Sequence, residues 1–138
     1  MRMLHTMIRV GDLQRSIDFY TQVLGMKLLR QSEYPSGRFT NTFVGYDDES
    51  ITSVLELTYN WDPEALQGGR NFGHLAYAVD NIYATCERLQ QHGVTILRPQ
   101  RDGYMAFVRS PDNISVELLQ VGQPLPVQEP WASMPNTG

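Results

Sequence analysis

"FGHLAYAVDN" at residues 72–81 and "MLHTMIRVGD" at residues 3–12 are two versions of one pattern, and this repetition predicts the architecture of the chain. Each stretch is typical of a β-strand that runs into the start of a helix, and each carries a histidine near its beginning, His74 and His5. The chain has only three histidines, so two of them occupy equivalent places 69 residues apart. A repeat with a fixed offset indicates a duplicated structural unit.

Each repeat continues with an amphipathic helix. Asp12 and Asn81 are typical N-cap residues, and Gly25 and Gly93 are typical of the position just after a helix. Apolar residues recur at helical spacing between these ends, which predicts one buried stripe on each helix. The stripes are Leu13, Ile17, Tyr20 and Leu24 in the first helix, and Ile82, Cys86 and Leu89 in the second.

Three more strands follow in each repeat, so each half reads strand, helix, three strands. "SVLELT" (53–58) parallels "SVELLQ" (115–120), and Ser110–Asn113 has the composition of a tight turn between two strands. We therefore predict an α+β fold of two βαβββ modules that form curved, mostly antiparallel sheets. The expected organisation is a single domain, 1–138, with module one at about 1–60, a linker at 61–70, module two at about 71–121 and a Pro-rich tail at 122–138.

The tail holds four of the eight prolines and Trp131. We expect it to dock on the protein surface or on a second subunit rather than to hang loose, because a free tryptophan side chain in water is unfavourable. The other isolated residues have ordinary interpretations. His92 is expected to complement the dipole at the end of the second helix, and Cys86 to pack in the core.

Composition excludes several classes of protein. A net charge of −4 is unlike a general nucleic-acid binder, which would be basic. No apolar run approaches the roughly 20 residues that span a bilayer, so no membrane partner is expected. No export signal is visible at the N-terminus, and a single cysteine excludes an internal disulfide. These features predict a cytoplasmic protein.

Two glutamates, Glu56 and Glu117, lie inside otherwise apolar strands at equivalent places in the repeats. A single such glutamate would be explained by a solvated sheet face or an ion pair, and a single histidine by ordinary packing. These explanations do not account for two histidines and two glutamates at equivalent positions, because duplicated units bring such positions together around a pseudo-twofold axis. Carboxylates at such short distances repel each other unless a cation lies between them.

We therefore predict that His5, Glu56, His74 and Glu117 bind a divalent metal ion. Mixed nitrogen and oxygen ligands suit first-row ions such as Ni²⁺, Fe²⁺, Mn²⁺, Co²⁺ or Zn²⁺. Four protein ligands on an octahedral ion leave two positions for water or substrate, which is typical of a catalytic site rather than a structural one.

Three stretches resemble one known family. "LHTMIRVGDLQRSIDFYTQVLGMKLLR" (4–30), "ELTYNW" (56–61) and "FGHLAYAVD" (72–80) are similar to glyoxalase I, the lactoylglutathione lyases of the vicinal oxygen chelate superfamily. The resemblance extends from residue 1 to about residue 121. It implies the same four metal ligands, and a homodimer whose sites lie at the subunit interface, where His5 and Glu56 of one chain join His74 and Glu117 of the other.

The resemblance also implies a set of substrate contacts. Arg9, Asn60 and Arg70 match the family's glutathione-binding residues. Relatives carry a longer, lysine-containing loop where this chain has the short "RPQRDGY" (98–104), so Arg98 and Arg101 are expected to replace those lysines. Arginines suit this task because they bind carboxylates through two parallel hydrogen bonds.

The activity that follows is the metal-dependent isomerisation of the hemithioacetal of methylglyoxal and glutathione to S-lactoylglutathione, which detoxifies methylglyoxal. The resemblance implies Glu117 as general base, with Glu56 as its partner for the proton on the other face. Ni²⁺ is the first choice of metal for this short form of the family, with Zn²⁺, Co²⁺ or Mn²⁺ as alternatives, and glutathione is the expected co-substrate.

The sequence also allows two other classes of protein. A related metal enzyme, an acyl-CoA epimerase or a dioxygenase, would share the fold, but a dioxygenase uses two histidines and one carboxylate. A metal-free small-molecule binding protein of the same fold would need none of the four proposed ligands.

Overall fold

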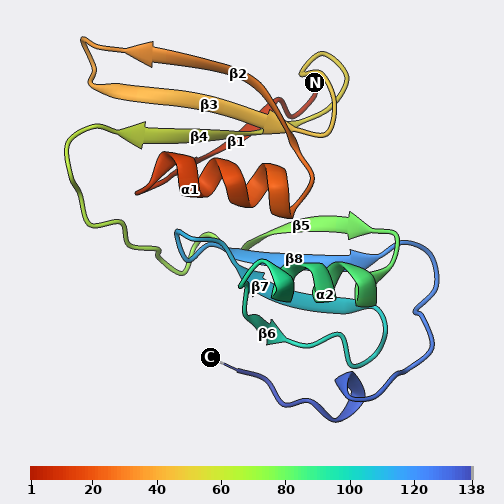
Figure 1. The fold of residues 1–138 in the computed structure, drawn as a ribbon. Helices are drawn as coiled ribbons and strands as arrows, with labels where there is room; N and C mark the ends of the chain where they lie inside the picture. The colour runs from red at the N-terminus through yellow and green to blue at the C-terminus, as the bar shows by residue number, and fades with distance from the viewer. Residues whose placement is uncertain (138) are drawn as a thin grey trace. The chain divides into compact units, whose positions relative to one another are not determined.

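The computed structural model describes residues 1–137 and divides into two compact units. The first unit is Met1–Gln67 and the second begins at Gly68. Figure 1 colours the first from red to yellow-green and the second from green to blue. The boundary falls inside the linker expected at 61–70. That the two units act as one domain stays a prediction.

The first unit is a four-stranded sheet with one helical segment. Its strands lie in the order β1-β4-β3-β2, with β1 parallel to β4 and the other pairs antiparallel. The elements are β1 (His5–Arg9), α1 (Leu13–Asp18), the π-helical turn η1 (Phe19–Val23), β2 (Lys27–Tyr34), β3 (Phe39–Gly45) and β4 (Val54–Asn60).

The second unit repeats this plan. Its strands lie in the equivalent order β5-β8-β7-β6, again with one parallel pair, β5 with β8. The elements are β5 (His74–Val79), α2 (Ile82–Gln91), β6 (Ile96–Arg98), β7 (Met105–Arg109), β8 (Ser115–Gln120) and the 3₁₀ turn η2 (Trp131–Ser133). The predicted α+β fold of two βαβββ modules is confirmed.

The helices begin at the predicted caps. The Asp12 side chain accepts a hydrogen bond from the Arg15 N–H, and the Asn81 side chain accepts one from the Ala84 N–H, each at 3.1 Å. Both satisfy a backbone donor that the helix leaves free. Gly25 ends the first helical segment with φ +78°, a conformation that glycine adopts without strain.

The first helix differs from the expected regular stripe at its second half. Residues 19–23 form a π-helical turn, in which the Leu24 N–H bonds the Phe19 carbonyl oxygen. The wider turn places two successive aromatic residues in the core, because Phe19 and Tyr20 are both buried. Leu24 is therefore only half-buried.

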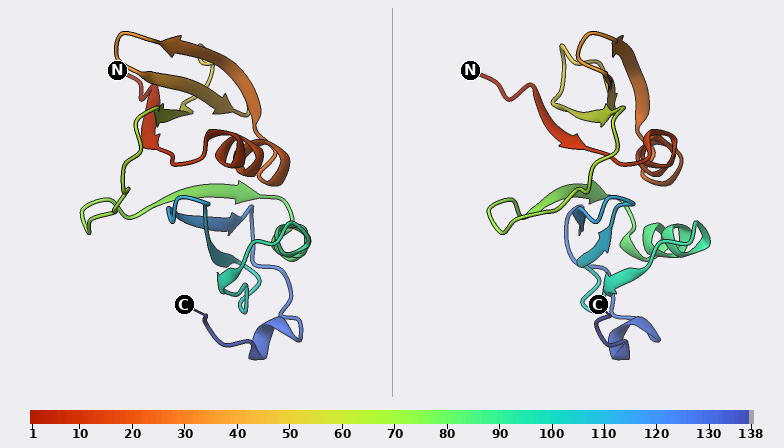
Figure 2. Two further views of the ribbon diagram at one scale, coloured as in Figure 1. Left: turned by 60° about the vertical axis from the view of Figure 1, so that its left-hand side comes forward. Right: turned by 90° about the vertical axis from the view of Figure 1, so that its left-hand side faces the viewer.

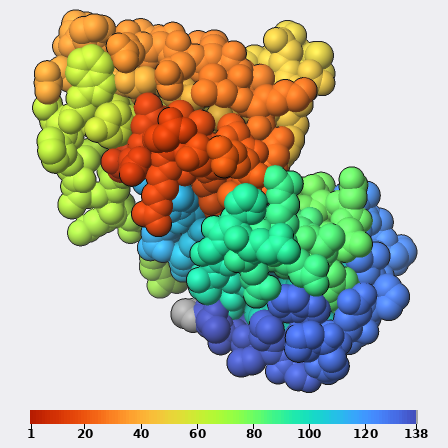
Figure 3. Space-filling view, viewed as in Figure 1, coloured from red at the N-terminus to blue at the C-terminus, as the bar shows by residue number. Residues whose placement is uncertain are grey.

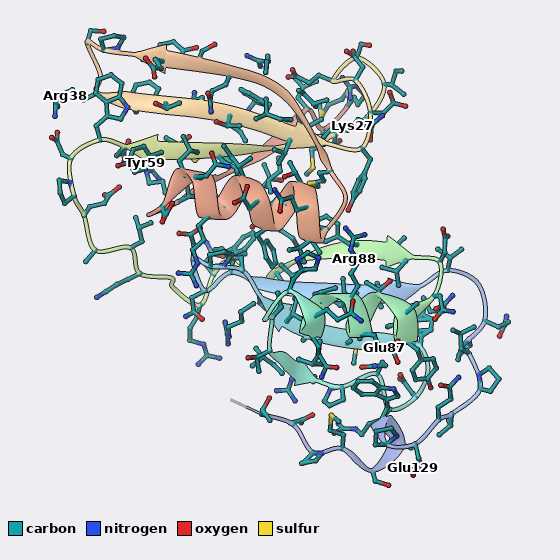
Figure 4. The ribbon with its side chains drawn as sticks, viewed as in Figure 1. Lys27, Arg38, Tyr59, Glu87, Arg88 and Glu129 are labelled. Atoms are coloured by element: carbon teal, nitrogen blue, oxygen red, sulfur yellow. The ribbon has the colours of Figure 1, made fainter. Side chains whose placement is uncertain are left out.

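Each helix covers one face of its sheet, as Figures 1 and 2 show. Leu55 and Leu57 of β4 are buried, as are Val116 and Leu118 of β8, and these residues alternate with the glutamates along each strand. Glu56 therefore lies on the face of its sheet that carries no helix, as the alternation predicts. In α2, Cys86 faces the core, whereas Glu87 and Arg88 lie on its outer surface (Figure 4).

The tail docks on the second unit, which confirms the expectation for Trp131. This side chain is buried, and the space-filling view shows the blue tail packed against the rest of the unit (Figure 3). The Leu125 N–H bonds the Gly103 carbonyl oxygen at 2.9 Å, and the Thr137 N–H bonds that of Leu97 at 2.8 Å. A Cβ at Gly103 would collide with the Leu125 carbonyl oxygen, so the close approach requires glycine. Within residues 1–137, no helix is long and apolar enough to cross a membrane.

Candidate metal and substrate site

His5 and Glu56 form a close pair on the open face of the first sheet. In the parallel register of β1 and β4, His5 lies opposite Val54, two residues before Glu56, so both side chains project from the same face. His5 Nε2 lies 3.0 Å from Glu56 Oε2. The glutamate side chain is 13% exposed, which leaves a nearly buried carboxyl group beside an imidazole.

His74 and Glu117 form the same pair in the second unit. His74 lies opposite Ser115, two residues before Glu117, and its Nε2 lies 2.9 Å from Glu117 Oε2. This glutamate is 15% exposed. The two pairs thus have the same strand register, nearly the same distance and nearly the same burial.

The donor atoms of each pair suit a divalent metal ion. A carboxylate this close to burial is unfavourable unless it has a positive partner, and an imidazole nitrogen and a carboxylate oxygen that converge are ordinary ligands of first-row ions. Within residues 1–137 no group of three or more histidine, cysteine, aspartate or glutamate residues is placed to hold an ion. The four predicted ligands therefore come as two pairs, one in each unit.

A phenylalanine extends each pair across its sheet. Phe43 of β3 lies opposite Glu56, and Phe107 of β7 lies opposite Glu117. Each ring meets the histidine of its own unit edge to face, with centroids 5.5 Å apart for His5 and Phe43 and 5.2 Å for His74 and Phe107. Sequence reasoning missed both phenylalanines. The dipeptide Phe-Val, repeated before each glutamate strand, is the signal that would have found them.

An arginine completes the row in each sheet. Arg30 of β2 lies opposite Phe43, and Arg98 of β6 lies opposite Phe107. Both positions directly follow a β-bulge in the pairing. Each open face thus carries the same row of four residues, one from each strand: His5, Glu56, Phe43 and Arg30 in the first unit, and His74, Glu117, Phe107 and Arg98 in the second.

Two of the expected substrate-binding residues lie in the first unit. Arg9 ends β1 on the same face as His5, and its side chain is exposed. Asn60 ends the neighbouring parallel strand β4, where its Nδ2 donates to Glu64 Oε1 at 2.7 Å. Parallel pairing brings the ends of β1 and β4 to the same edge of the sheet, so both polar groups lie beyond the His5–Glu56 pair.

The other three lie in the second unit. Arg70 and Arg98 are exposed. Arg101 is half-buried, and its guanidinium donates to the Met134 carbonyl oxygen of the tail at 2.8 Å. The structure therefore gives Arg101 a second partner that sequence reasoning did not foresee, because the partner lies 33 residues away in a segment without a recognisable pattern.

The two residues without a predicted chemical role are placed as expected. Cys86 is fully buried in α2, and burial raises the pKa of its thiol to about 12. A thiol with that pKa is neutral and unreactive at ordinary pH. His92 lies at the C-cap of α2, where its N–H bonds carbonyl oxygens of the last turn.

Comparison with known proteins defines the class to which this fold and these pairs belong. The chain belongs to the Glyoxalase/Bleomycin resistance protein/Dioxygenase superfamily, whose family model matches residues 2–118. That range covers β1 to β7 completely and β8 as far as Leu118.

Closer relatives are more specific. The lactoylglutathione lyases of Neisseria meningitidis serogroup A and Escherichia coli O157:H7 are 51% and 50% identical to this chain over 87% of its length, and cover 91% and 93% of their own. The glyoxalase I of Leishmania major superimposes with a TM-score of 0.84 at 45% identity, covering 87% of this chain and 86% of that one. Within the superfamily the chain is thus of the lactoylglutathione lyase kind, an enzyme that isomerises the hemithioacetal of methylglyoxal and glutathione to S-lactoylglutathione.

Proposed function

We propose that His5, Glu56, His74 and Glu117 hold the divalent metal ion with which enzymes of this family work, and that the ion is Ni²⁺. The observation that carries this proposal is the pair of equivalent contacts, 3.0 Å in one unit and 2.9 Å in the other, between an exposed imidazole and a nearly buried carboxyl group. No thiolate is available to the site, because the single cysteine is buried, and this supports ligation by nitrogen and oxygen.

The complete site is proposed to form between two copies of the chain. Each unit offers only two donors, whereas an octahedral ion with two open positions needs four from the protein. In the proposed homodimer, His5 and Glu56 of one subunit join His74 and Glu117 of the other. The open sheet faces supply the surface for this assembly, since their side chains are left without a covering helix.

The residues around the pairs have distinct proposed roles. When bound, the metal ion supplies positive charge that favours loss of a proton from the carbon beside a carbonyl group. Glu117 takes that proton as general base. Glu56 transfers the proton on the opposite face of the substrate. The carboxylates of the glutathione part are held by Arg9, Asn60, Arg70 and Arg98. Arg101 adds a further contact to them while its guanidinium also donates to the Met134 carbonyl oxygen.

Glutathione is the proposed thiol. The two lactoylglutathione lyases share 50–51% of residues with this chain, whereas the trypanothione-dependent enzyme of Leishmania major shares 45%. Glutathione is also the thiol of a reducing compartment, and a chain with one buried free cysteine suits such a compartment. We therefore propose that the enzyme works in the cytoplasm.

The metal and the thiol are tested by one set of rate measurements. Metal-free protein is reloaded in turn with Ni²⁺, Zn²⁺, Co²⁺ and Mn²⁺, and thioester formation from methylglyoxal is followed in the ultraviolet with glutathione or trypanothione. The expected result is the highest rate with Ni²⁺ and glutathione. Activity that survives complete metal removal would contradict the metal site, and a preference for trypanothione would contradict the proposed thiol.

Arg9→Ala tests the carboxylate contacts separately from the metal. Loss of one charge-assisted hydrogen bond removes about 1.5–3 kcal/mol, so the KM for the glutathione adduct should rise by about 10- to 100-fold. The affinity for Ni²⁺, measured by titration calorimetry, should stay at the value of the unmodified protein. An unchanged KM would remove Arg9 from the substrate site.

Subunit sharing is tested by mixing two impaired variants. In the proposal, Glu56→Gln and Glu117→Gln chains each lose activity, because every site in either homodimer lacks one glutamate. A mixed dimer contains one site with both changes and one site with none. Co-refolding the two variants should therefore restore activity, with each pure variant refolded alone as control. No recovery in a mixture shown to contain mixed dimers would place the complete site within one chain.

A further inference from the structure

The row of side chains on the first sheet continues past the metal ligands into a stack. The guanidinium carbon of Arg30 lies 3.7 Å above the centre of the Phe43 ring. The Phe43 ring in turn meets the His5 ring edge to face, at an interplanar angle of 88°. A cation over the face of an aromatic ring is attracted by the ring's electron distribution. Arg30, Phe43 and His5 therefore form one continuous chain of contacts.

Glu49 fixes the outer end of this chain of contacts. Its two carboxylate oxygens accept from Arg30 Nε at 2.6 Å and from Arg30 Nη2 at 3.0 Å, a planar two-point contact that defines the orientation of the guanidinium. The Glu49 backbone carbonyl oxygen accepts a further hydrogen bond from Arg2 at 2.7 Å. Glu49 is thus tied to the strand β2 by its side chain and to the N-terminal segment by its backbone.

The two-point contact between Glu49 and Arg30 is called the clamp below. The second unit has the same row of side chains without an equivalent of this clamp. Phe107 meets His74 at 5.2 Å, and Arg98 occupies the place of Arg30, but within residues 1–137 no acidic side chain pairs with Arg98. The reason lies in the connecting segments. Residues 46–53 between β3 and β4 carry Glu49, whereas residues 110–114 between β7 and β8 form a short turn with no glutamate.

We infer that Arg30, held by Glu49, is a positioning residue that fixes the ring of His5 through Phe43. This inference rests on the proposed role of His5 as a metal ligand. A ligand whose ring plane is fixed before binding loses less conformational freedom when the ion arrives. The two halves of the site are consequently unequal, with His5 held in place and His74 freer to adjust.

The metal-free protein offers a direct test, because the chain contains only three histidines. Nitrogen-edited NMR of the imidazole groups gives three sets of signals, which His92→Gln and the two ligand variants assign. Arg30→Met removes the cation over Phe43 while keeping an unbranched side chain. The expected result is a shifted or broadened His5 signal, while the His74 signal stays at its original position.

Arg98→Met is the matched control, because it changes the equivalent position of the other sheet. It should leave the His74 signal as it is, since no acidic residue fixes Arg98. Glu49→Gln keeps Arg30 but removes the two-point contact, and should move the His5 signal in the same direction by a smaller amount. This second variant also decides the matter if Arg30→Met fails to fold. An unchanged His5 signal in both Arg30→Met and Glu49→Gln, or an equal response of His74 to Arg98→Met, would overturn the inference.

Nickel titration adds a second readout. Loss of groups that orient a ligand typically weakens metal binding by 10- to 100-fold, and we expect a value near the lower end for Arg30→Met. The same titration of the unmodified protein separates the two claims. If Ni²⁺ leaves the His5 and His74 signals unmoved, the proposed ligand set is wrong, whereas the comparison in metal-free protein still decides whether Arg30 positions His5.

Discussion

The two sheets carry the same row of side chains, yet within residues 1–137 an acidic residue holds the arginine of only the first row. His5, Glu56, Phe43 and Arg30 repeat as His74, Glu117, Phe107 and Arg98, with the same register in both sheets. The clamp on Arg30 comes from the segment 46–53, which has no counterpart of equal length in the second unit. Strand register therefore preserves the histidine–glutamate pair in both units, whereas the connecting segments decide how firmly each pair is held.

The second unit has its own addition, the C-terminal tail. Tyr83 of α2 donates to the Pro126 carbonyl oxygen at 3.0 Å, and Arg101 donates to that of Met134. The tail therefore supports the segment 98–104, where two of the proposed substrate contacts lie. In the first unit the extra contacts reach His5, a proposed metal ligand, and in the second they support residues 98–104, which carry two proposed substrate contacts.

The largest expected effect comes from the glutamates themselves. Glu117→Gln should lower kcat by about 10²- to 10⁴-fold, the usual contribution of a general base, and Glu56→Gln should lower it less. The measurement is the initial rate of thioester formation on nickel-loaded protein, with the bound metal determined for each variant. Equal losses would show that the two pairs are interchangeable in the reaction, and full activity of the double variant would contradict the assignment of both.

Cys86 provides a probe of the second unit alone, because its equivalent in the first helix stripe is Ile17. Burial raises the pKa of the thiol to about 12, so at pH 8 its thiolate fraction lies more than about a thousandfold below that of an ordinary thiol with a pKa near 8.5. We expect negligible reaction with a thiol reagent in the native protein and rapid reaction in guanidinium. Rapid native-state reaction would show that α2 opens readily.

Trp131→Ala should destabilise the second unit by about 3 kcal/mol, the low end for removal of a buried tryptophan side chain. Hydrogen exchange should then accelerate at the backbone amides of β6 and residues 99–104, with the amides of the first unit unchanged. Trp61→Ala is the control in the first unit, where the indole donates to Thr40 Oγ1 at 2.9 Å. Equal acceleration in both units would mean that the tail is not a local support.

The smallest expected effect is the pH dependence of the stability that the Glu49–Arg30 contact provides. The hydrogen bonds from Arg30 hold the pKa of the Glu49 carboxyl below its usual value, so the stabilisation exists above the pKa of the unfolded chain, about 4.3, and is lost as pH falls through the folded value. Glu49→Gln should lower the Tm slightly at pH 7 and not at pH 3. The difference should also shrink in 1 M salt, because the pair is largely exposed. A difference that persists at pH 3 would point to a packing effect.

Several features could be predicted because they depend on short-range pattern. Asp12 and Asn81 begin the helices as predicted, and the alternation of Glu56 and Glu117 with buried leucine and valine residues placed both carboxyl groups on the open faces. The contact that holds Arg30 could not be predicted, because Glu49 is 19 residues away in a segment with no periodicity. The contact of Arg101 with Met134 could not be predicted for the same reason.

The amino-acid pattern alone predicts the duplication, the strand and helix order, and the position of each histidine and glutamate within its repeat, because side-chain alternation and helix capping are local properties of the chain. Tertiary structure alone decided that His5 and Glu56, or His74 and Glu117, approach within about 3 Å. It also decided that, within residues 1–137, Arg30 is held by an acidic side chain and Arg98 is not. The physical reason is that parallel register and loop partners are set by packing between segments far apart in the chain, and no local pattern records that packing.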